Sequence, residues 1–318
     1  MPAISAIMSV YNAEKYISQA IDSILNQSFK DFEFIIIEDC STDNSLAILN
    51  SYAEKDSRIK IIQKQENKRM KGFIENLNIG LNEAQGKYIA RMDADDIAHP
   101  LRFEKQYQYL ETNPDIFMVG SAVNFIDENN HFIKKLEALE HHTEIIKQMP
   151  KTVTMYHPVI MFRNYSNIRY RNLYYCEDYD LYLRSINEGK KFHNFTESLL
   201  DYRILNTSIS RKDNKFLCIL FVEKAKQFYR ETIQKGKDSY HNFVPEDLLS
   251  ILDDTRTPNK DDLKFALRVS AKFKYKNEFN KLLKIYHQNY TKDIETRILQ
   301  TIINLPNIVS KIYFKITQ

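Results

Sequence analysis

The 318-residue chain lacks any stretch that approaches the ~20 consecutive apolar residues an α-helix needs to cross a bilayer. Residues 1–10 contain neither a basic segment nor a small-residue cleavage site, so they are predicted to form a first strand rather than a signal peptide. The few cysteines (Cys40, Cys176 and Cys218) are odd in number and far apart. This pattern indicates neither a disulfide framework nor a zinc site, and it favours a reducing compartment such as the cytoplasm.

The chain also has little net charge, only +3, but that charge is unevenly distributed. Residues 212–318 contain 20 Lys and Arg against 13 Asp and Glu, so the first 211 residues carry a net charge of −4. The apolar fraction of 43% is ordinary for a globular protein. An acidic first part and a basic last part suggest different partners, and the basic part suits an anionic membrane surface or a phosphate-bearing acceptor.

Strand and helix patterns alternate over the first hundred residues. Apolar β-favouring runs predict strands at residues 4–10, 32–38, 59–63 and 87–92. Helical spacing predicts helices at 12–26, with Asn12 as N-cap, from about 45 to 55, and at 73–84. This alternation is typical of βαβ units and a parallel sheet, in which ligands bind beyond the carboxyl ends of the strands.

The sequence from residue 100 onward predicts a few more strands and helices and then a change to mainly helical structure. We expect a helix at 100–113, a strand at 116–126 followed by a hairpin turn, a strand at 158–163 and a helix at 177–188. After residue 210 the pattern becomes mainly helical. The sequence therefore predicts an α/β domain over residues 1–210 and a mainly α-helical region over 211–318.

The segment Tyr88–Asp96 ends an apolar run with three carboxylates in four residues: Asp93, Asp95 and Asp96. Like charges at a strand end are costly unless a cation lies beside them, and a hard divalent ion with oxygen ligands is suited to that place. In extended backbone Asp93 and Asp95 would share one face, so both could contact a metal–diphosphate unit, with Asp96 capping the next segment. The alternative is an acidic turn that caps a helix.

Two further acidic clusters could likewise either bind a ligand or cap a helix. Asp39 directly follows a predicted buried strand, where it would contact a nucleotide base or ribose, or else cap the next helix. Glu177 and Asp178 open a predicted helix, where one of them could act as a general base, or both could complement the helix dipole. His157 is either structural or a site residue, and Arg203 would pair with acids or with a diphosphate.

In order along the chain, these residues resemble glycosyltransferase family 2, which has the GT-A fold. The resemblance covers residues 4 to about 210 and rests on an ordered set of motifs: Ser9–Asn12, residues 24–28, Glu38–Asp43, Asn78–Gly80, Gly86–Asp96, His157–Pro158, Glu177–Asp178 and Tyr202–Arg203. The chain is similar to bacterial surface-polysaccharide, capsular and lipooligosaccharide transferases, including N-acetylhexosaminyltransferases. The implied fold is a Rossmann-like, mostly parallel sheet flanked by helices.

The resemblance implies an inverting, metal-dependent transfer of a hexose or N-acetylhexosamine from a UDP-sugar to a glycan or lipid-linked acceptor, an EC 2.4 activity. Asp178, aided by Glu177, would be the base, and Asp95 with Asp93 would hold Mn²⁺ or Mg²⁺. The remaining nucleotide-sugar contacts would come from Tyr11, Asn12, Asp39, Asn78, Arg91, His157 and Arg203. No nucleic-acid partner is implied.

The sequence departs from the family pattern in places that affect the expected diphosphate contacts and the number of sugars transferred. The segment 67–72 is longer than usual, so any of Lys68, Arg69 or Lys71 could take the basic role beside the diphosphate. The chain has no Trp, which the Gln-x-x-Arg-Trp motif of processive synthases requires, so transfer of one sugar at a time is expected. Two alternatives are a nucleotidyltransferase, which would need a Gly-rich loop where Ser9–Ala13 has no glycine, and an inactive saccharide-binding domain.

The last stretch, residues 294–316, has apolar residues at helical spacing with basic residues nearby. It could lie on the inner face of a membrane as an interfacial helix, or pack against the catalytic domain or a second subunit in a homodimer. Pro306 argues against one continuous helix.

Overall fold

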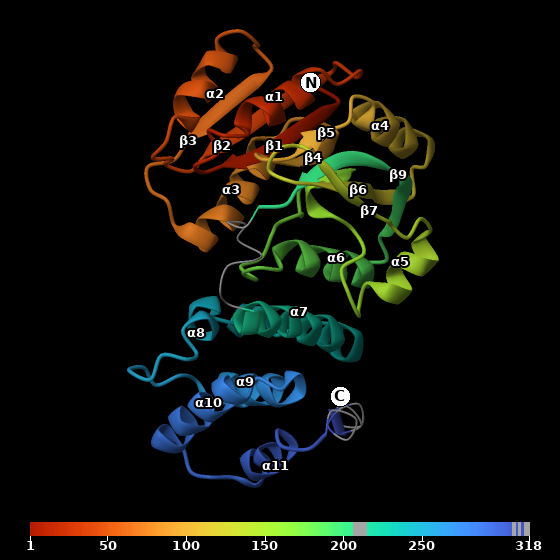
Figure 1. Cartoon of the computed structure of the whole chain (residues 1–318). Helices are drawn as coiled ribbons and strands as arrows, with labels where there is room; N and C mark the ends of the chain where they lie inside the picture. Colours follow the sequence, from red (N-terminus) through yellow and green to blue (C-terminus); the bar gives the residue numbers. More distant parts are fainter. Residues whose placement is uncertain (206–214, 307–309, 311–312, 315–318) are drawn as a thin grey trace. The chain divides into compact units, whose positions relative to one another are not determined.

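The structure of the chain, a computed structural model, describes residues 1–205, 215–306, 310, 313 and 314. The chain forms two compact units (Figure 1). The first comprises Met1–Asn172 and Glu177–Ser208, and the second comprises Leu173–Cys176 and Ile209–Gln318. The predicted boundary between residues 210 and 211 lies outside the described residues and stays a prediction.

Half of the sheet in the first unit is parallel, as predicted. Its strands are β1 (Ile4–Val10), β2 (Phe32–Glu38), β3 (Ile59–Gln63) and β4 (Tyr88–Asp93), in the order β3-β2-β1-β4. They are rich in buried Ile, Phe and Met, because both faces of a parallel sheet are covered. The register pairs Val10 with Glu38 and Ser9 with Asp93. The acidic ends of β2 and β4 therefore flank the end of β1 at one edge of the sheet.

Four helices connect this part of the chain: α1 (Ile17–Leu25), α2 (Ser45–Ala53), α3 (Arg69–Glu83) and α4 (Arg102–Thr112). The predicted start of the first helix at Asn12 is wrong, because Asn12 has a φ of 49° and lies in a loop before Tyr16, the N-cap. Its side-chain oxygen accepts a hydrogen bond from the backbone N–H of Thr42 at 2.7 Å. Asn enters the left-handed region more readily than most residues, which suits it to this loop rather than to a cap. Helix α3 begins four residues earlier than predicted.

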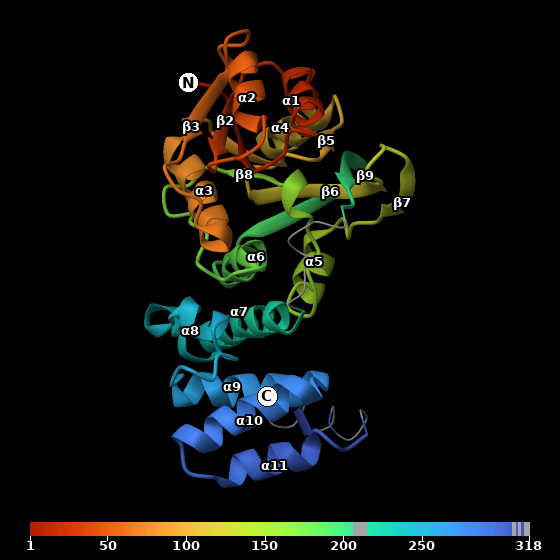
Figure 2. The ribbon, with the colours of Figure 1, turned by 60° about the vertical axis from the view of Figure 1, so that its left-hand side comes forward.

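The other half of the sheet is mixed, and the described residues contain nine strands in one sheet. It comprises β5 (Ile97–Ala98), β6 (Ile116–Ile126), β7 (Phe132–Leu136), β8 (Met161–Arg163) and β9 (Lys191–Arg203), with η1 (His157–Val159), α5 (His142–Gln148) and α6 (Glu177–Asn187) between them. The order continues from β4 through β8, β6 and β9 to β5. Strands β6 and β9 of this part lie side by side in Figure 2. The predicted strand at 158–163 is only half right, since its first residues form η1.

No strand was predicted over residues 191–203, although β9 is the longest strand of the sheet. Its polar positions Lys191, His193, Asn194 and Glu197 interrupt the apolar alternation that would have revealed it. Pairing with β6 on one side and β5 on the other makes it a strand. This strand matters for the site, because it ends at Arg203.

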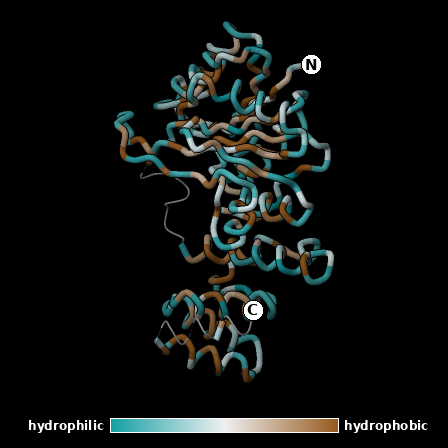
Figure 3. Tube along the Cα trace, turned by 90° about the vertical axis from the view of Figure 1, so that its right-hand side faces the viewer, coloured by the Kyte–Doolittle hydropathy of each residue, from teal (hydrophilic) through white to brown (hydrophobic). Residues whose placement is uncertain are grey.

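The second unit is mainly helical, as predicted. It contains α7 (Lys215–Lys235), η2 (Tyr240–Asn242), α8 (Pro245–Leu249), α9 (Lys260–Phe273), α10 (Lys276–Asn289) and α11 (Ile294–Ile302). Leu299 and Ile302 of α11 are buried, and α11 packs against α9. These two apolar residues within the predicted segment 294–316 therefore pack within their own unit. Brown apolar positions recur along the strands and C-terminal helices in Figure 3. The predicted continuation beyond Pro306 lies mostly outside the described residues. Among the residues that the structure describes, no helix is long and apolar enough to cross a membrane.

Candidate active site

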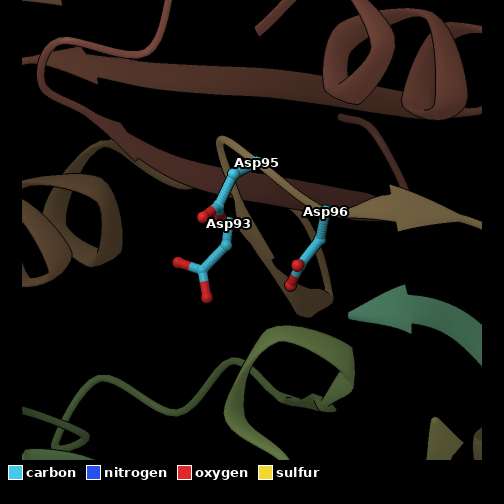
Figure 4. Close-up of side chains that lie close together, drawn as sticks. All are labelled: Asp93, Asp95 and Asp96. Atoms are coloured by element: carbon cyan, nitrogen blue, oxygen red, sulfur yellow. The ribbon is translucent and has the colours of Figure 1, made fainter. Parts of the chain in front are cut away.

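The end of β4 brings three carboxylates together. One oxygen from each of Asp93, Asp95 and Asp96 lies within 4.8 Å of the others, and the three side chains extend to the same side of the loop (Figure 4). The prediction that Asp93 and Asp95 share a face of extended backbone is wrong in its premise, because the strand ends at Asp93 and residues 94–95 form a turn. The turn, not the pleat, gathers the carboxylates.

Asp96 is the most deeply buried of the three, with 1% of its surface exposed. One of its oxygens accepts a hydrogen bond from the backbone N–H of Arg203 at 2.8 Å, which fits the predicted structural role. Its other oxygen, Oδ2, is buried without a hydrogen-bond partner among the described residues. A buried carboxylate oxygen without a donor is costly, so this oxygen favours a ligand at the cluster.

Crowding changes the acidity of the cluster. Burial and the charge of Asp93 raise the pKa of Asp95 to about 6. Burial and the charge of Asp95 raise the pKa of Asp96 well above its usual value. Both shifts show that this place disfavours additional negative charge unless a cation neutralises it. Three clustered carboxylates with an unpartnered oxygen are a donor set that suits a hard divalent ion such as Mn²⁺ or Mg²⁺.

A buried arginine, Arg91, lies on the same strand. Its guanidinium forms an ion pair with Asp93, and its carbonyl accepts a hydrogen bond from Nη2 of the buried Arg102 at 2.6 Å. Burial, together with the charge of Arg91, lowers the pKa of Arg102 to about 9. Arg91 therefore supplies positive charge directly at the acidic cluster. Its predicted contact with a nucleotide sugar stays a prediction.

Glu177 and Asp178 occupy the first turn of α6. Burial and the charge of Asp178 raise the pKa of Glu177 to about 8. Burial also raises the pKa of Asp178, but only to about 6, because the backbone N–H of Tyr179 donates to its carboxylate at 2.7 Å. Burial and mutual repulsion thus favour one shared proton on this pair, and the Tyr179 N–H favours ionisation of Asp178. The charge of Asp93 adds to both shifts, so this pair and the cluster on β4 act on each other.

The edge beyond β1 and β2 holds the residues predicted to contact the base. Tyr11 is 51% exposed, so its ring is open to a ligand. Asp39 is 4% exposed and forms an ion pair with Lys64 at 2.8 Å between Oδ1 and Nζ. Helix α2 begins at Ser45, whose backbone N–H donates to Asp43 at 2.9 Å, so Asp39 does not cap it. Glu38 accepts a hydrogen bond from the backbone N–H of Ser41 at 2.6 Å in the loop before this helix. Asn12 is engaged by Thr42, as described above.

The remaining predicted residues have protein partners. Asn78 exchanges two hydrogen bonds of 2.9 Å with the backbone of Tyr170, and His157 Nε2 lies 2.9 Å from the Tyr170 hydroxyl. Burial and the charge of Arg91 lower the pKa of His157, which keeps its ring neutral. Arg203 donates from Nε to the carbonyl of Asp95 at 2.7 Å. These contacts shape the site, and direct contact of these residues with a nucleotide sugar stays a prediction.

Sequence reasoning missed Lys64, although it weighed the nearby Lys68, Arg69 and Lys71. Lys68 pairs with Glu66 and Glu75 rather than facing Asp39. A positional signal was present: Lys64 directly follows β3 as Asp39 directly follows β2, and adjacent parallel strands bring such positions together. The observed register of Glu38 opposite Gln63 shows this.

The α/β fold with clustered carboxylates at the carboxyl edge of its sheet is one that an enzyme binding a ligand through a divalent ion would have, and comparison with known proteins identifies the family. The profile described as "Glycosyl transferase family 2" matches residues 5–188. The chain therefore belongs to glycosyltransferase family 2 and is a glycosyltransferase of class EC 2.4. Of the alternatives raised from the sequence, a nucleotidyltransferase is set aside by this result.

Individual relatives agree with the family. The O-antigen biosynthesis glycosyltransferase WbnJ of Escherichia coli is 39% identical over 244 residues, which cover 73% of this chain and 89% of WbnJ. S. aureus TarS 1-349 in complex with UDP-GlcNAc has a TM-score of 0.58 at 15% identity, covering 91% of this chain and 93% of that one. Mannosyltransferase PcManGT from Pyrobaculum calidifontis, in complex with GDP-Man and Mn²⁺, has a TM-score of 0.52 at 13% identity and covers 94% and 79%. At such identities the two structures establish the shared fold.

Proposed function

We propose that this glycosyltransferase moves a hexose or N-acetylhexosamine from a UDP-sugar to a hydroxyl of a glycan or lipid-linked saccharide. The transfer is a single displacement that inverts the anomeric centre and adds one sugar per encounter. The observation that carries this proposal is the mutual influence of two acidic groups: the cluster that ends β4 and the pair that begins α6. The cluster on β4 suits a diphosphate with its counter-ion, and the pair on α6 contains the proposed base, Asp178.

Each acid of the pair has a separate role. Asp178, ionised at neutral pH, takes the proton from the acceptor hydroxyl, because a useful base has a pKa near or below the working pH. The acceptor oxygen forms its bond to the anomeric carbon while the bond to the UDP oxygen breaks, and UDP leaves with the electron pair. Glu177, whose pKa is raised by burial and by the charge of Asp178, holds the proton of the pair and leaves the ionised state to its neighbour.

A separate group of residues binds the donor. Tyr11 stacks on the base, and Asp39 accepts a hydrogen bond from it. Asp93 and Asp95, with the unpartnered oxygen of Asp96 beside them, would hold Mn²⁺ or Mg²⁺. A divalent ion bound there would neutralise the charge of the diphosphate leaving group. The complex of PcManGT with Mn²⁺ supports a divalent ion, and the complexes of TarS with UDP and UDP-GlcNAc support a uridine donor.

The similarity to WbnJ, an O-antigen biosynthesis enzyme, supports a role in surface-polysaccharide synthesis. The acceptors of such a route are glycans or lipid-linked saccharides. A position at the inner face of a membrane, through the basic residues of 211–318, and a homodimer stay predictions.

A thermal-shift screen of UDP, GDP, CDP and ADP, each with and without Mn²⁺, tests the donor class. A shift produced by UDP and enlarged by Mn²⁺ is the expected result. UDP-sugars are then compared by UDP release. A preference for GDP, or a UDP shift that Mn²⁺ leaves unchanged, would contradict the uridine donor or the metal, respectively.

A further inference from the structure

The ion pair between Asp39 and Lys64 is unusual because it is almost completely buried. The side chains of Asp39 and Lys64 are 5% and 8% exposed, and the Nζ–Oδ1 distance is 2.8 Å. Neither Lys64 Nζ nor Asp39 Oδ1 has any other hydrogen-bond partner among the described residues. Glu75 is the next acid, 3.5 Å from Nζ. Most lysines keep their ammonium group in water, so burying this one requires a reason.

The surrounding backbone is built closely around the pair. A Cβ at Gly72, in the first turns of α3, would lie 3.1 Å from Asp39 Oδ2 and 3.4 Å from Lys64 Nζ. The absent side chain lets the helix approach both charged groups. Asn67 Nδ2 donates to the carbonyl of Asp39 at 2.9 Å, and the Cys40 thiol lies 3.3 Å from the carbonyl of Lys64. Lys64 thus holds the carboxylate of Asp39, and Asn67 holds its backbone carbonyl.

We propose that Lys64 is a positioning residue that makes Asp39 an obligate hydrogen-bond acceptor and thereby selects uracil over cytosine in the donor nucleotide. This inference rests on the proposed function, in which Asp39 contacts the base. An ionised carboxylate can only accept hydrogen bonds, whereas a protonated one can also donate. Uracil presents an N–H at ring position 3, and cytosine presents an unprotonated nitrogen there. The two rings have the same size, and they also differ at position 4, where uracil has a carbonyl oxygen and cytosine an amino group. An acceptor that faces ring position 3 therefore suits uracil, whereas a donor there suits cytosine.

The paired ammonium is what keeps the carboxylate in the accepting form. A buried carboxylate that loses its cation takes up a proton, because an unpaired charge away from water is costly. The protonated group could then donate to the ring nitrogen of cytosine. Removing the positive charge should therefore weaken UDP binding and improve CDP binding, which a general loss of structure would not do.

The test is calorimetric binding of UDP and CDP, each with Mn²⁺, to the full-length chain and to variants. Lys64→Gln retains a hydrogen-bond donor without the charge, and Lys64→Met removes both. We expect the ratio of UDP to CDP affinity to fall about ten- to one-hundredfold in both, the worth of one hydrogen bond to a charged group. Lys64→Arg, which keeps the charge, should restore most of the ratio.

The matched control is Lys60→Met, which removes an exposed lysine from β3 whose Nζ lies 2.5 Å from Glu83. It should leave the ratio unchanged. The informative variant is Lys64→Gln or Lys64→Met, whichever has the melting temperature of the original protein. If its ratio of UDP to CDP affinity is unchanged, the inference is wrong. Asp39→Asn separates the two proposals. If Asp39→Asn abolishes the preference for UDP over CDP and the Lys64 variants retain that preference, Asp39 recognises the base without help from Lys64. If the original protein does not prefer UDP to CDP, the proposed uridine donor itself is wrong.

Discussion

Replacing Asp178 by Asn is the sharpest test of the assignment of the base. Asn has nearly the same shape as Asp, but it cannot take a proton from the acceptor. The Tyr179 N–H that donates to Asp178 at 2.7 Å can still donate to the amide oxygen of Asn, so α6 should keep its first turn. The variant therefore removes one chemical ability while leaving the fold and the donor side intact.

The expected loss of turnover follows from the role of the base. The Tyr179 N–H that donates to Asp178 at 2.7 Å stabilises the ionised carboxylate that a base requires. General-base catalysis contributes about 10²–10⁴-fold, so turnover should fall by at least ~100-fold, or about 3 kcal/mol in activation free energy. In the original protein, turnover should also decline as the pH falls through about 6, because protonation of Asp178 removes the base.

The assay is UDP release from the UDP-sugar that gives the largest thermal shift, with UDP affinity measured separately by calorimetry. We expect UDP affinity within about threefold of the original value, since the proposed role of Asp178 is toward the acceptor and not the donor. Glu177→Gln is the matched variant, because burial and the charge of Asp178 raise the pKa of Glu177 and Gln resembles its protonated form. Its turnover should fall much less.

A structural control comes from Asp180, two residues further along α6. Its carboxylate is 1% exposed and pairs with Arg171 and with Arg184, the latter at 2.9 Å. Asp180→Asn should lower the melting temperature more than Asp178→Asn does. Turnover of Asp178→Asn within tenfold of the original, at full occupancy by donor, would refute its role as the base.

Three further outcomes are expected. Asp95→Ala should abolish the gain in UDP affinity that Mn²⁺ produces, measured by calorimetry; an unchanged gain would remove Asp95 from the metal site. The raised pKa of Asp95 means that, without metal, its stabilising contribution is complete below pH 3.8 and lost as the pH rises through about 6. Because a metal needs ionised ligands, Mn²⁺ should raise the melting temperature more at pH 8 than at pH 5, and equal shifts would contradict the carboxylate ligands. Gly80→Val should lower the melting temperature by at least about 2 °C, since even a Cβ there would lie 2.4 Å from Ile7 Cγ2, and overpacking costs about 1–3 kcal/mol. An unchanged melting temperature would show that α3 can move away from β1.

The sequence by itself determined the parallel half of the fold and the places where the acids cluster. Strands β1, β2 and β3 match their predicted bounds because buried parallel strands need uninterrupted apolar runs, which are visible in the residues. Carboxylates directly after such runs must lie at the carboxyl edge of the sheet, so Asp39 and Asp93 could be placed at the edge where ligands bind.

Tertiary structure alone decided how the acids differ. The turn after Asp93, the partnerless oxygen of Asp96 and the separation of Glu177 from Asp178 in acidity all depend on burial and on distances between distant segments. Strand β9 also could not be predicted locally, because polar positions interrupt its apolar pattern. The role of Lys64 depends on its ion pair with Asp39, which only the folded chain forms. Local patterns record which side chains a segment buries, whereas electrostatic free energies depend on every charge nearby, and those neighbours are assembled only by folding.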